Sequence, residues 1–433
     1  MMSANRSSSL SRALRVLLAV ALWVTGVHGA SARNDAALPG EVLVKLRTTQ
    51  ALAPLLDKYP LRVVDQFGGR PIYRLEVTGQ ASVQDTIAAL LLEIDVLLAE
   101  PNIVNSSPEA RRNAVWAIGN PQDYAVQWAP AALRLAEAHR LSTGAGVRVA
   151  VLDTGVDRRH PALAGRLLPG FDFVDYDDDP SEEGSEANIA FGHGTHVAGL
   201  VALVAPDAMI MPVRVLDPDG QGNAWVLAEA LLHAVDPDGD PATDDGAHVI
   251  NLSLGTTTRT RIFDAVAELA TCSAVFDNDL ADPGYDADAA RCGQMRGVVI
   301  VAAAGNDGSN AVREYPAAET GTHGLAAVGA SAANMRRASF SNDGSWVRFA
   351  APGESITSSI PGGGYGTWSG TSMAAPLFAG TAALLRAINP NMKPDDVLRR
   401  IGSRSAALCG TNLRQIDAAA ALRDVNPPNT ICK

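Results

Sequence analysis

The sequence predicts an α/β protein whose main domain has three layers built around a mostly parallel sheet. From Gly146 onward, four short apolar runs rich in β-branched residues alternate with stretches of helical periodicity. Such runs are typical of strands buried on both faces, and the helices between them provide the crossovers that parallel strands need. A smaller α+β unit is expected before this domain, because strand-like and helix-like runs also occupy residues 41–105.

The first 32 residues have the layout of a secretory signal peptide. Arg6, Arg12 and Arg15 precede an apolar run at residues 16–23, and the small residues 30–32 (ASA) resemble a cleavage site. The alternative is a membrane anchor, but this run is much shorter than the roughly 20 residues that a spanning helix needs. We find no second run of spanning length in the sequence. The mature protein is therefore expected to be exported, outside the cell or into a periplasm, and to be soluble.

The unit at residues 33–105 is expected to contain two strands and a helix. These are the apolar alternating runs at 41–46 and 72–77 and the helical-period stretch at 83–98. Residues 106–122, which follow, are polar and interrupted by prolines, as in a linker. Because such segments are preferred sites of proteolytic cleavage, we expect processing within them.

The main domain is expected at residues 123–425, followed by a short tail at 426–433. Its predicted strands are 147–153, 209–216, 248–254 and 297–304, and its predicted helices are 194–204, 225–235 and 372–388. Parallel α/β sheets bind their ligands at the carboxyl ends of the strands. Asp153, residues 253–255 and Asn306 all fall at such ends.

Charge and cysteine content narrow the class of protein. The formal net charge is −12, and the three arginines of the signal peptide add positive charge that the exported chain loses. An acidic chain of this kind is unsuited to nucleic acid or anionic membranes. The four cysteines form two disulfides most economically between sequence neighbours, although three pairings exist, and each bridge would contribute about 3 kcal/mol. The expected pairs are Cys272 with Cys292 and Cys409 with Cys432.

Three motifs supply an aspartate, a histidine and a serine in that order along the chain. They are VLDTG ending at Gly155, HGTHVAG beginning at His193 and GTSMAAP beginning at Gly370. A serine hydroxyl becomes a nucleophile when a base is within hydrogen-bond reach and a third group orients that base. Chymotrypsin-like enzymes have the order His, Asp, Ser, and α/β-hydrolases have Ser, Asp, His and a GxSxG motif. The chain therefore resembles the subtilisin-like serine proteases, or subtilases.

The resemblance implies a role for each motif residue. Ser372 would be the nucleophile, His193 its general base, Asp153 the carboxylate that orients the base, and Asn306, in AAAGN, a donor to the oxyanion. Two rival residues are interpreted as structural, namely His196 in the second motif and Asp157 beyond the first.

Substrate binding is also implied by the resemblance. The segment INLSLG resembles the strand that pairs, main chain to main chain, with an extended substrate, and its binding residues would be Ser253, Leu254 and Gly255. Gly305 and Asn306, with the residues after them, would help to form the primary specificity pocket. Members of this family often take hydrophobic residues in that pocket.

By the same resemblance, residues 33–105 are similar to a subtilase propeptide, which assists folding and then inhibits its own enzyme. An unrelated N-terminal module is the alternative. The expected function is a secreted serine endopeptidase that is made as a zymogen, is monomeric, acts on proteins or peptides and needs no cofactor for catalysis. The alternative is a catalytically silent subtilase-fold binding protein, which would normally lack a triad residue or the oxyanion asparagine.

Two acidic stretches suggest structural calcium. They begin at Asp175 (DYDDDPSEEGSE) and at Asp236 (DPDGDPATDDG), and closely spaced carboxylates suit a cation that takes six to eight oxygen ligands. The second stretch lacks the glutamate that closes an EF-hand loop. Acidic surface loops without metal are the alternative interpretation of both.

Overall fold

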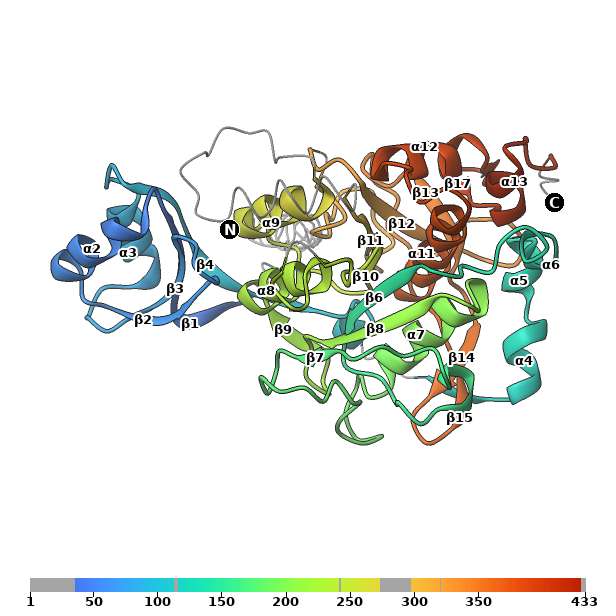
Figure 1. Cartoon of the computed structure of the whole chain (residues 1–433), viewed down its shortest axis with the longest axis horizontal. Helices are drawn as coiled ribbons and strands as arrows, with labels where there is room; N and C mark the ends of the chain where they lie inside the picture. Colours follow the sequence, from blue (N-terminus) through green and yellow to red (C-terminus); the bar gives the residue numbers. More distant parts are fainter. Residues whose placement is uncertain (1–35, 113–115, 241–242, 273–296, 320, 430–433) are drawn as a thin grey trace, which may run out of the picture. The chain divides into compact units, whose positions relative to one another are not determined.

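The computed structural model describes residues 36–112, 116–240, 243–272, 297–319 and 321–429. The predicted signal peptide, Cys292 and Cys432 lie outside the described residues. The described chain forms an N-terminal antiparallel unit and an α/β domain with a mostly parallel nine-stranded sheet, as expected (Figure 1).

The N-terminal unit is an antiparallel sheet with two helices on one face (Figure 1). Its strands, in sheet order, are β2 (Leu61–Gln66), β3 (Ile72–Val77), β1 (Ala37–Leu46) and β4 (Val96–Ser106), and its helices are α2 (Leu52–Lys58) and α3 (Val83–Leu90). Side chains of a strand alternate between faces. Accordingly, Val42 and Val44 pack with Leu55 and Leu90 of these helices, whereas Leu43 belongs to a different cluster.

The helix predicted at residues 83–98 is too long. Helix α3 begins after Ser82, whose side chain accepts a hydrogen bond from the Asp85 amide, and it ends at Leu90. Residues 96–98 instead open strand β4, because their apolar side chains complete the sheet beside β1. The sequence analysis did not predict strand β2, in which half-buried and exposed side chains alternate and three of the six residues are polar.

The second face of this small sheet packs on helix α8 (Ala224–Val235) of the main domain. Leu43 and Phe67 share a core cluster with Trp225, and the rings of Phe67 and Trp225 meet edge to face at 5.5 Å. Strand β4 also caps two helices: Asn102 accepts from the Trp225 amide, and Glu100 accepts from two amides at the start of α9 (Arg261–Thr271). Acceptors at helix N-termini satisfy otherwise unpaired amides.

The main sheet confirms the four predicted strands and adds others. In sheet order its strands are β16 (Ala406–Ala407), β17 (Arg414–Gln415), β13 (Phe349–Pro352), β12 (Leu325–Ser331), β11 (Val299–Ala303), β10 (Val249–Leu252), β6 (Arg148–Asp153), β8 (Met209–Arg214) and β7 (Phe171–Asp172). All neighbouring pairs are parallel except β16 with β17. The sheet is covered by helices on both faces (Figure 1).

Alternate side chains of each central strand enter two separate cores. On β6, Val149 and Val151 pack in the cluster that contains α7 (His193–Val204) and α11 (Thr371–Ile388), whereas Ala150 and Leu152 pack with α8 and α9. Both faces are thus apolar, which explains the near-continuous hydrophobic runs in the sequence. A separate three-stranded sheet, in the order β14 (Ile356–Ile360), β15 (Gly364–Trp368) and β5 (Ala117–Gly119), flanks α7.

Helix α11 corrects the expectation that no further run of spanning length occurs. Among the described residues it is the one helix long and apolar enough to cross a membrane. Nearly all of its side chains are buried in the core of the main domain. Its hydrophobicity is therefore explained by the core that it fills.

Cys272 and Cys409 are both disulfide-bonded. The bonding partners that the sequence analysis assigns to them, Cys292 and Cys432, lie outside the described residues, so that pairing remains a prediction.

The packing of α11 on α7 predicts the effect of one substitution. In an unconstrained helix, replacing glycine by alanine is favourable by about 1 kcal/mol. At Gly380, however, an added Cβ would lie 2.6 Å from Val204 Cβ, so Gly380→Ala should destabilise the protein by about 1–3 kcal/mol. Denaturant unfolding of the Gly380→Ala chain, compared with the unchanged chain, would measure this loss. Gly321→Ala, with nothing within 4 Å of the added Cβ, is the control, and equal midpoints for both variants would contradict the prediction.

Candidate active site

Three distant segments bring Asp153, His193 and Ser372 together. Asp153 is the last residue of β6, His193 is the first of α7, and Ser372 is the second of α11. The Nδ1 atom of His193 lies 2.7 Å from Asp153 Oδ1, which also accepts a hydrogen bond from the Thr154 amide. All three predicted triad side chains are at most 1% exposed. The aspartate can thus fix the orientation of the imidazole.

Asn306 is held beside the serine by Thr371. The Oδ1 atom of Asn306 accepts from both the amide and the hydroxyl of Thr371 at 2.9 Å, and the Thr371 hydroxyl accepts from the Gly305 amide. Because its oxygen is engaged in this way, Asn306 presents its Nδ2 donor toward the site. Such a fixed donor is suited to stabilising a developing oxyanion.

A carboxylate that the sequence analysis did not single out occupies the centre of this site. The Oε2 atom of Glu109 accepts from Ser372 Oγ at 2.6 Å and lies 3.2 Å from His193 Nε2, while Oε1 accepts from Asn306 Nδ2 at 2.7 Å. A Cβ built on Gly370 would lie 1.7 Å from the same Oε1, so only glycine leaves room for this oxygen. Glu109 belongs to the predicted linker, and no motif marks it.

The electrostatics of the site follow from two carboxylates that flank one imidazole. Burial alone would lower the pKa of His193, but Asp153 and Glu109 outweigh it and raise the pKa to about 10. Burial would likewise raise the pKa of Glu109, yet the contact with His193 and the donors Ser372 and Asn306 lower it. The imidazole is therefore protonated at neutral pH and cannot accept the proton of Ser372 in this state.

The residues before Glu109 lie in the cleft as an added strand. Strand β4 continues from the N-terminal sheet to pair antiparallel with β9 (Gln221–Asn223). On its other side, Ser106 exchanges two main-chain hydrogen bonds of 2.9 Å with Gly255. The next residue, Ser107, donates its amide to the Gly220 carbonyl at 3.0 Å. This is the pairing mode that the sequence analysis expected for an extended peptide.

The other predicted substrate-binding residues lie around the same point. Ser253 accepts from Ser372 Oγ through its carbonyl at 3.2 Å and donates its own hydroxyl to the Ser372 carbonyl at 2.9 Å. Leu254 points its side chain into the core, so only its main chain is available to a ligand. Gly305 adopts a φ of +95°, which favours glycine at this turn.

The two rival residues have structural contacts. His196 is fully buried, its Nε2 atom faces the carbonyls of Ile356 and Gly366, and burial lowers its pKa to about 3. Asp157 accepts from the amides of Arg159 and Gly362 and so stabilises local turns. Neither side chain makes a hydrogen bond to Ser372.

Comparison with known proteins identifies the family. The profile of the Subtilase family matches residues 144–422, and that of the fervidolysin N-terminal prodomain matches residues 27–102. The chain belongs to the subtilase family. It is 34% identical over 369 residues to the thermophilic serine proteinase of Bacillus sp. strain AK1, covering 82% of this chain and 80% of that protein. It is 37% identical over 269 residues to thermitase of Thermoactinomyces vulgaris, covering 60% of this chain and 81% of that protein.

A solved structure shares the arrangement of both parts of the chain. Fervidolysin from Fervidobacterium pennivorans, described as a keratinolytic enzyme related to subtilisin, superposes with a TM-score of 0.70. The match covers 90% of this chain and 62% of fervidolysin, and the sequences are 23% identical. The two proteins therefore share a fold. The N-terminal unit of this subtilase is therefore a prodomain.

A half-buried glutamate, Glu182, connects the segments that carry two of the predicted triad residues. Glu182 accepts from the hydroxyl of Thr154, next to Asp153, and from the amide and hydroxyl of Thr195, two residues after His193. Burial raises its pKa to about 7. It ties the segment that carries the aspartate to the helix that carries the histidine. The sequence analysis included Glu182 only in an acidic stretch.

In the first acidic stretch, two carboxylates pair with a buried arginine. Arg214, 1% exposed, makes ion pairs with Asp172 at 2.6 Å, Asp175 at 2.7 Å and Glu183 at 3.0 Å. A buried guanidinium requires such partners. Within the stretch, Arg214 thus engages Asp175 and Glu183, and Glu182 is engaged by Thr154 and Thr195. Among the described residues, no group of carboxylates in this stretch is close enough together to hold a metal ion.

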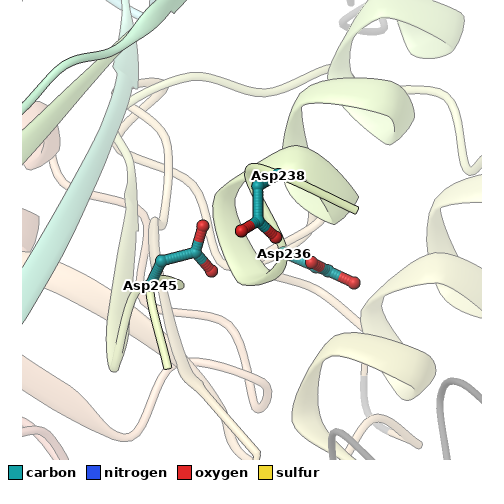
Figure 2. A group of neighbouring side chains, drawn as sticks. All are labelled: Asp236, Asp238 and Asp245. Carbon is teal, nitrogen blue, oxygen red and sulfur yellow. The ribbon is translucent and has the colours of Figure 1, made fainter. Parts of the chain in front are cut away.

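The second acidic stretch does gather carboxylates. One oxygen from each of Asp236, Asp238 and Asp245 lies within 4.8 Å of the others, just after α8 (Figure 2). The C-terminal end of a helix carries partial negative charge, which adds to the attraction for a cation. Oxygen ligands of this kind are those that calcium prefers.

The contacts of His193 with both Asp153 and Glu109 predict a raised pKa that can be measured. In the uncleaved Ser372→Ala chain, His193 should keep its proton up to about pH 10, whereas Glu109→Gln should lower that pKa because one carboxylate is lost. The raised pKa stabilises the folded chain fully below pH 6.5, and this contribution is lost as the pH rises toward 10. Histidine NMR titration measures both values, with His196, neutral above about pH 3, as the internal control. An imidazole titrating near 6.5 in the uncleaved chain would contradict this electrostatic account.

Proposed function

We propose that this subtilase is a secreted serine endopeptidase that hydrolyses proteins through an acyl-enzyme on Ser372. The observation that carries the proposal is the convergence of Ser372, His193 and Asn306 on one carboxylate, with Asp153 behind the imidazole. The two oxygens of this carboxylate accept from the serine and from the asparagine, so the carboxylate lies where the oxyanion of a tetrahedral intermediate would need donors.

The catalytic steps follow from these contacts once Glu109 has left. His193 Nε2 takes the proton from Ser372 Oγ, which attacks the substrate carbonyl carbon, and Asn306 Nδ2 donates to the resulting oxyanion. Asp153 stabilises the imidazolium, which then protonates the leaving amine as the peptide bond breaks. A water molecule, deprotonated by the same imidazole, releases the acyl group and restores the serine.

In the zymogen, we propose that the prodomain and Glu109 act together as an intramolecular inhibitor. The prodomain packs on α8, and its strand β4 leads the chain into the cleft, where Glu109 satisfies the oxyanion donor and keeps His193 protonated. Cleavage within residues 106–122 would release both effects. We also propose that the signal peptide is removed at Ala30-Ser31-Ala32 and that the mature protein is a monomer. Its disulfides would join Cys272 to Cys292 and Cys409 to Cys432.

Chemical labelling tests the enzymatic function. The processed protein should react covalently with a fluorophosphonate probe, because only an activated serine attacks phosphorus readily. Ser372→Ala should abolish labelling and leave the chain uncut between residues 106 and 122 when it is produced alone. Ser253→Ala is the control and should retain labelling, because the hydroxyl that it removes donates to the Ser372 carbonyl and accepts from Asn251 Nδ2 but makes no hydrogen bond to the Ser372 hydroxyl. Folded, processed protein that is not labelled would favour the silent binding protein.

We further propose that calcium binds at Asp236, Asp238 and Asp245 and stabilises the fold without entering the reaction. Calcium should raise the melting temperature of the mature protein and chelator should lower it, because a ligand that binds only the folded state stabilises it. Asp236→Asn combined with Asp245→Asn should remove this response. Asp179→Asn, at an exposed aspartate of the first stretch, should preserve it. Identical melting with calcium and chelator, and no metal in elemental analysis, would contradict the proposal.

A further inference from the structure

Another buried glutamate lies between the two glycine segments of the cleft. Glu314 is 0% exposed and belongs to the segment that joins β11 to β12. Its neighbour Tyr315 exchanges two main-chain hydrogen bonds with Thr256, which fixes this segment beside Gly255. Glu314 therefore has a defined place at the wall on which an extended peptide pairs.

The carboxylate of Glu314 lies between Gly255 of the predicted substrate-pairing strand and Gly305 of the predicted primary specificity pocket. A Cβ built on Gly255 would lie 2.3 Å from Glu314 Oε1, and a Cβ built on Gly305 would lie 3.2 Å from Oε2. Gly305 directly precedes the oxyanion donor Asn306. The side chain thus places negative charge within the space that the two glycines leave open, a few residues from the reacting atoms.

In the uncleaved chain an arginine already pairs with this carboxylate. The guanidinium of Arg111, two residues after Glu109, forms a short ion pair with Glu314 Oε1. A carboxylate this deeply buried is costly unless a cation accompanies it. When the linker is cut and leaves the cleft, the position that the Arg111 guanidinium occupies beside Glu314 becomes available to a substrate side chain.

We propose that Glu314 makes this enzyme prefer substrates with arginine or lysine immediately before the scissile bond. This inference rests on the proposed endopeptidase function and names its substrate class. It replaces the hydrophobic preference that the family resemblance implied, because an apolar side chain cannot form the ion pair that the Arg111 guanidinium makes with this carboxylate. Arginine should exceed lysine, since a planar guanidinium can donate two hydrogen bonds to one carboxylate, whereas an ammonium group is a point charge.

Matched fluorogenic peptides that differ only before the scissile bond test the preference. For the mature enzyme, kcat/KM with arginine should exceed that with phenylalanine or leucine by at least about 30-fold, since truncating one side of a buried charge pair commonly costs this much or more. Glu314→Gln keeps the shape and removes the charge, so it should reduce the arginine value by a similar factor and leave the phenylalanine value within about threefold.

A control variant and an inhibition assay on the wild-type enzyme keep the test of Glu314 informative even if Glu314→Gln does not fold. Glu319→Gln alters another buried glutamate of the same segment, one that pairs with Arg259, and should preserve the arginine preference. Should Glu314→Gln fail to fold, competitive inhibition of the wild-type enzyme by benzamidine, an aromatic amidinium, is expected, and no inhibition at millimolar concentration would oppose the inference.

The outcomes separate the two proposals. Equal cleavage of arginine and phenylalanine peptides by an enzyme that is labelled at Ser372 would overturn the role of Glu314 and leave the endopeptidase function intact. An unchanged arginine preference in Glu314→Gln would do the same. Failure of the processed protein to react with the fluorophosphonate would instead overturn the proposed function itself.

Discussion

The parallel pairing of β6, β10 and β11 is the constraint on which the site depends. In this register Leu152 and Ala302 lie beside Leu252, so the residues that follow each strand emerge at one edge. Asp153, Ser253 and Asn306 are brought to that edge by the backbone alone. Burial of both sheet faces by α7, α11, α8 and α9 holds the register, because slipping one strand by a residue would exchange the side chains of the two cores.

In the proposed function, inhibition and catalysis use the same side chains. Ser372, His193 and Asn306 contact the two oxygens of Glu109 in the uncleaved chain. During hydrolysis they would be the nucleophile, the general base and the oxyanion donor. In the uncleaved chain, the Glu109 carboxylate therefore occupies the preorganised site before any substrate binds. A buried carboxylate and an imidazolium offset each other's desolvation, which explains how two charges persist at the centre of a dry cleft.

The sequence predicted those features that depend on local patterns. We could recognise the strand runs, the helix that carries Ser372 in its first turn and the three motifs with the predicted triad residues. Each of these features depends on residues that are neighbours in the sequence. Glu109, Glu182 and Glu314 were missed as functional residues, since each acquires its importance from partners that lie far away in the chain. The overlong helix at 83–98 has a related cause: periodicity alone cannot distinguish the end of a helix from the start of a buried strand.

Tertiary structure also changed the interpretation of charge. The acidic stretch from Asp175 suggested a ligand set for a metal, but Arg214, more than thirty residues later in the chain, pairs with two of its seven carboxylates, Asp175 and Glu183.

Strand β4 belongs to two sheets at once, one in the prodomain and one in the cleft. The number of residues between Leu98 and Ser106 therefore determines which side chain after the strand reaches Ser372. Inserting one residue there would turn every following side chain to the opposite face of the strand. The proposed inhibition by Glu109 thus depends on the length of this strand as well as on its sequence.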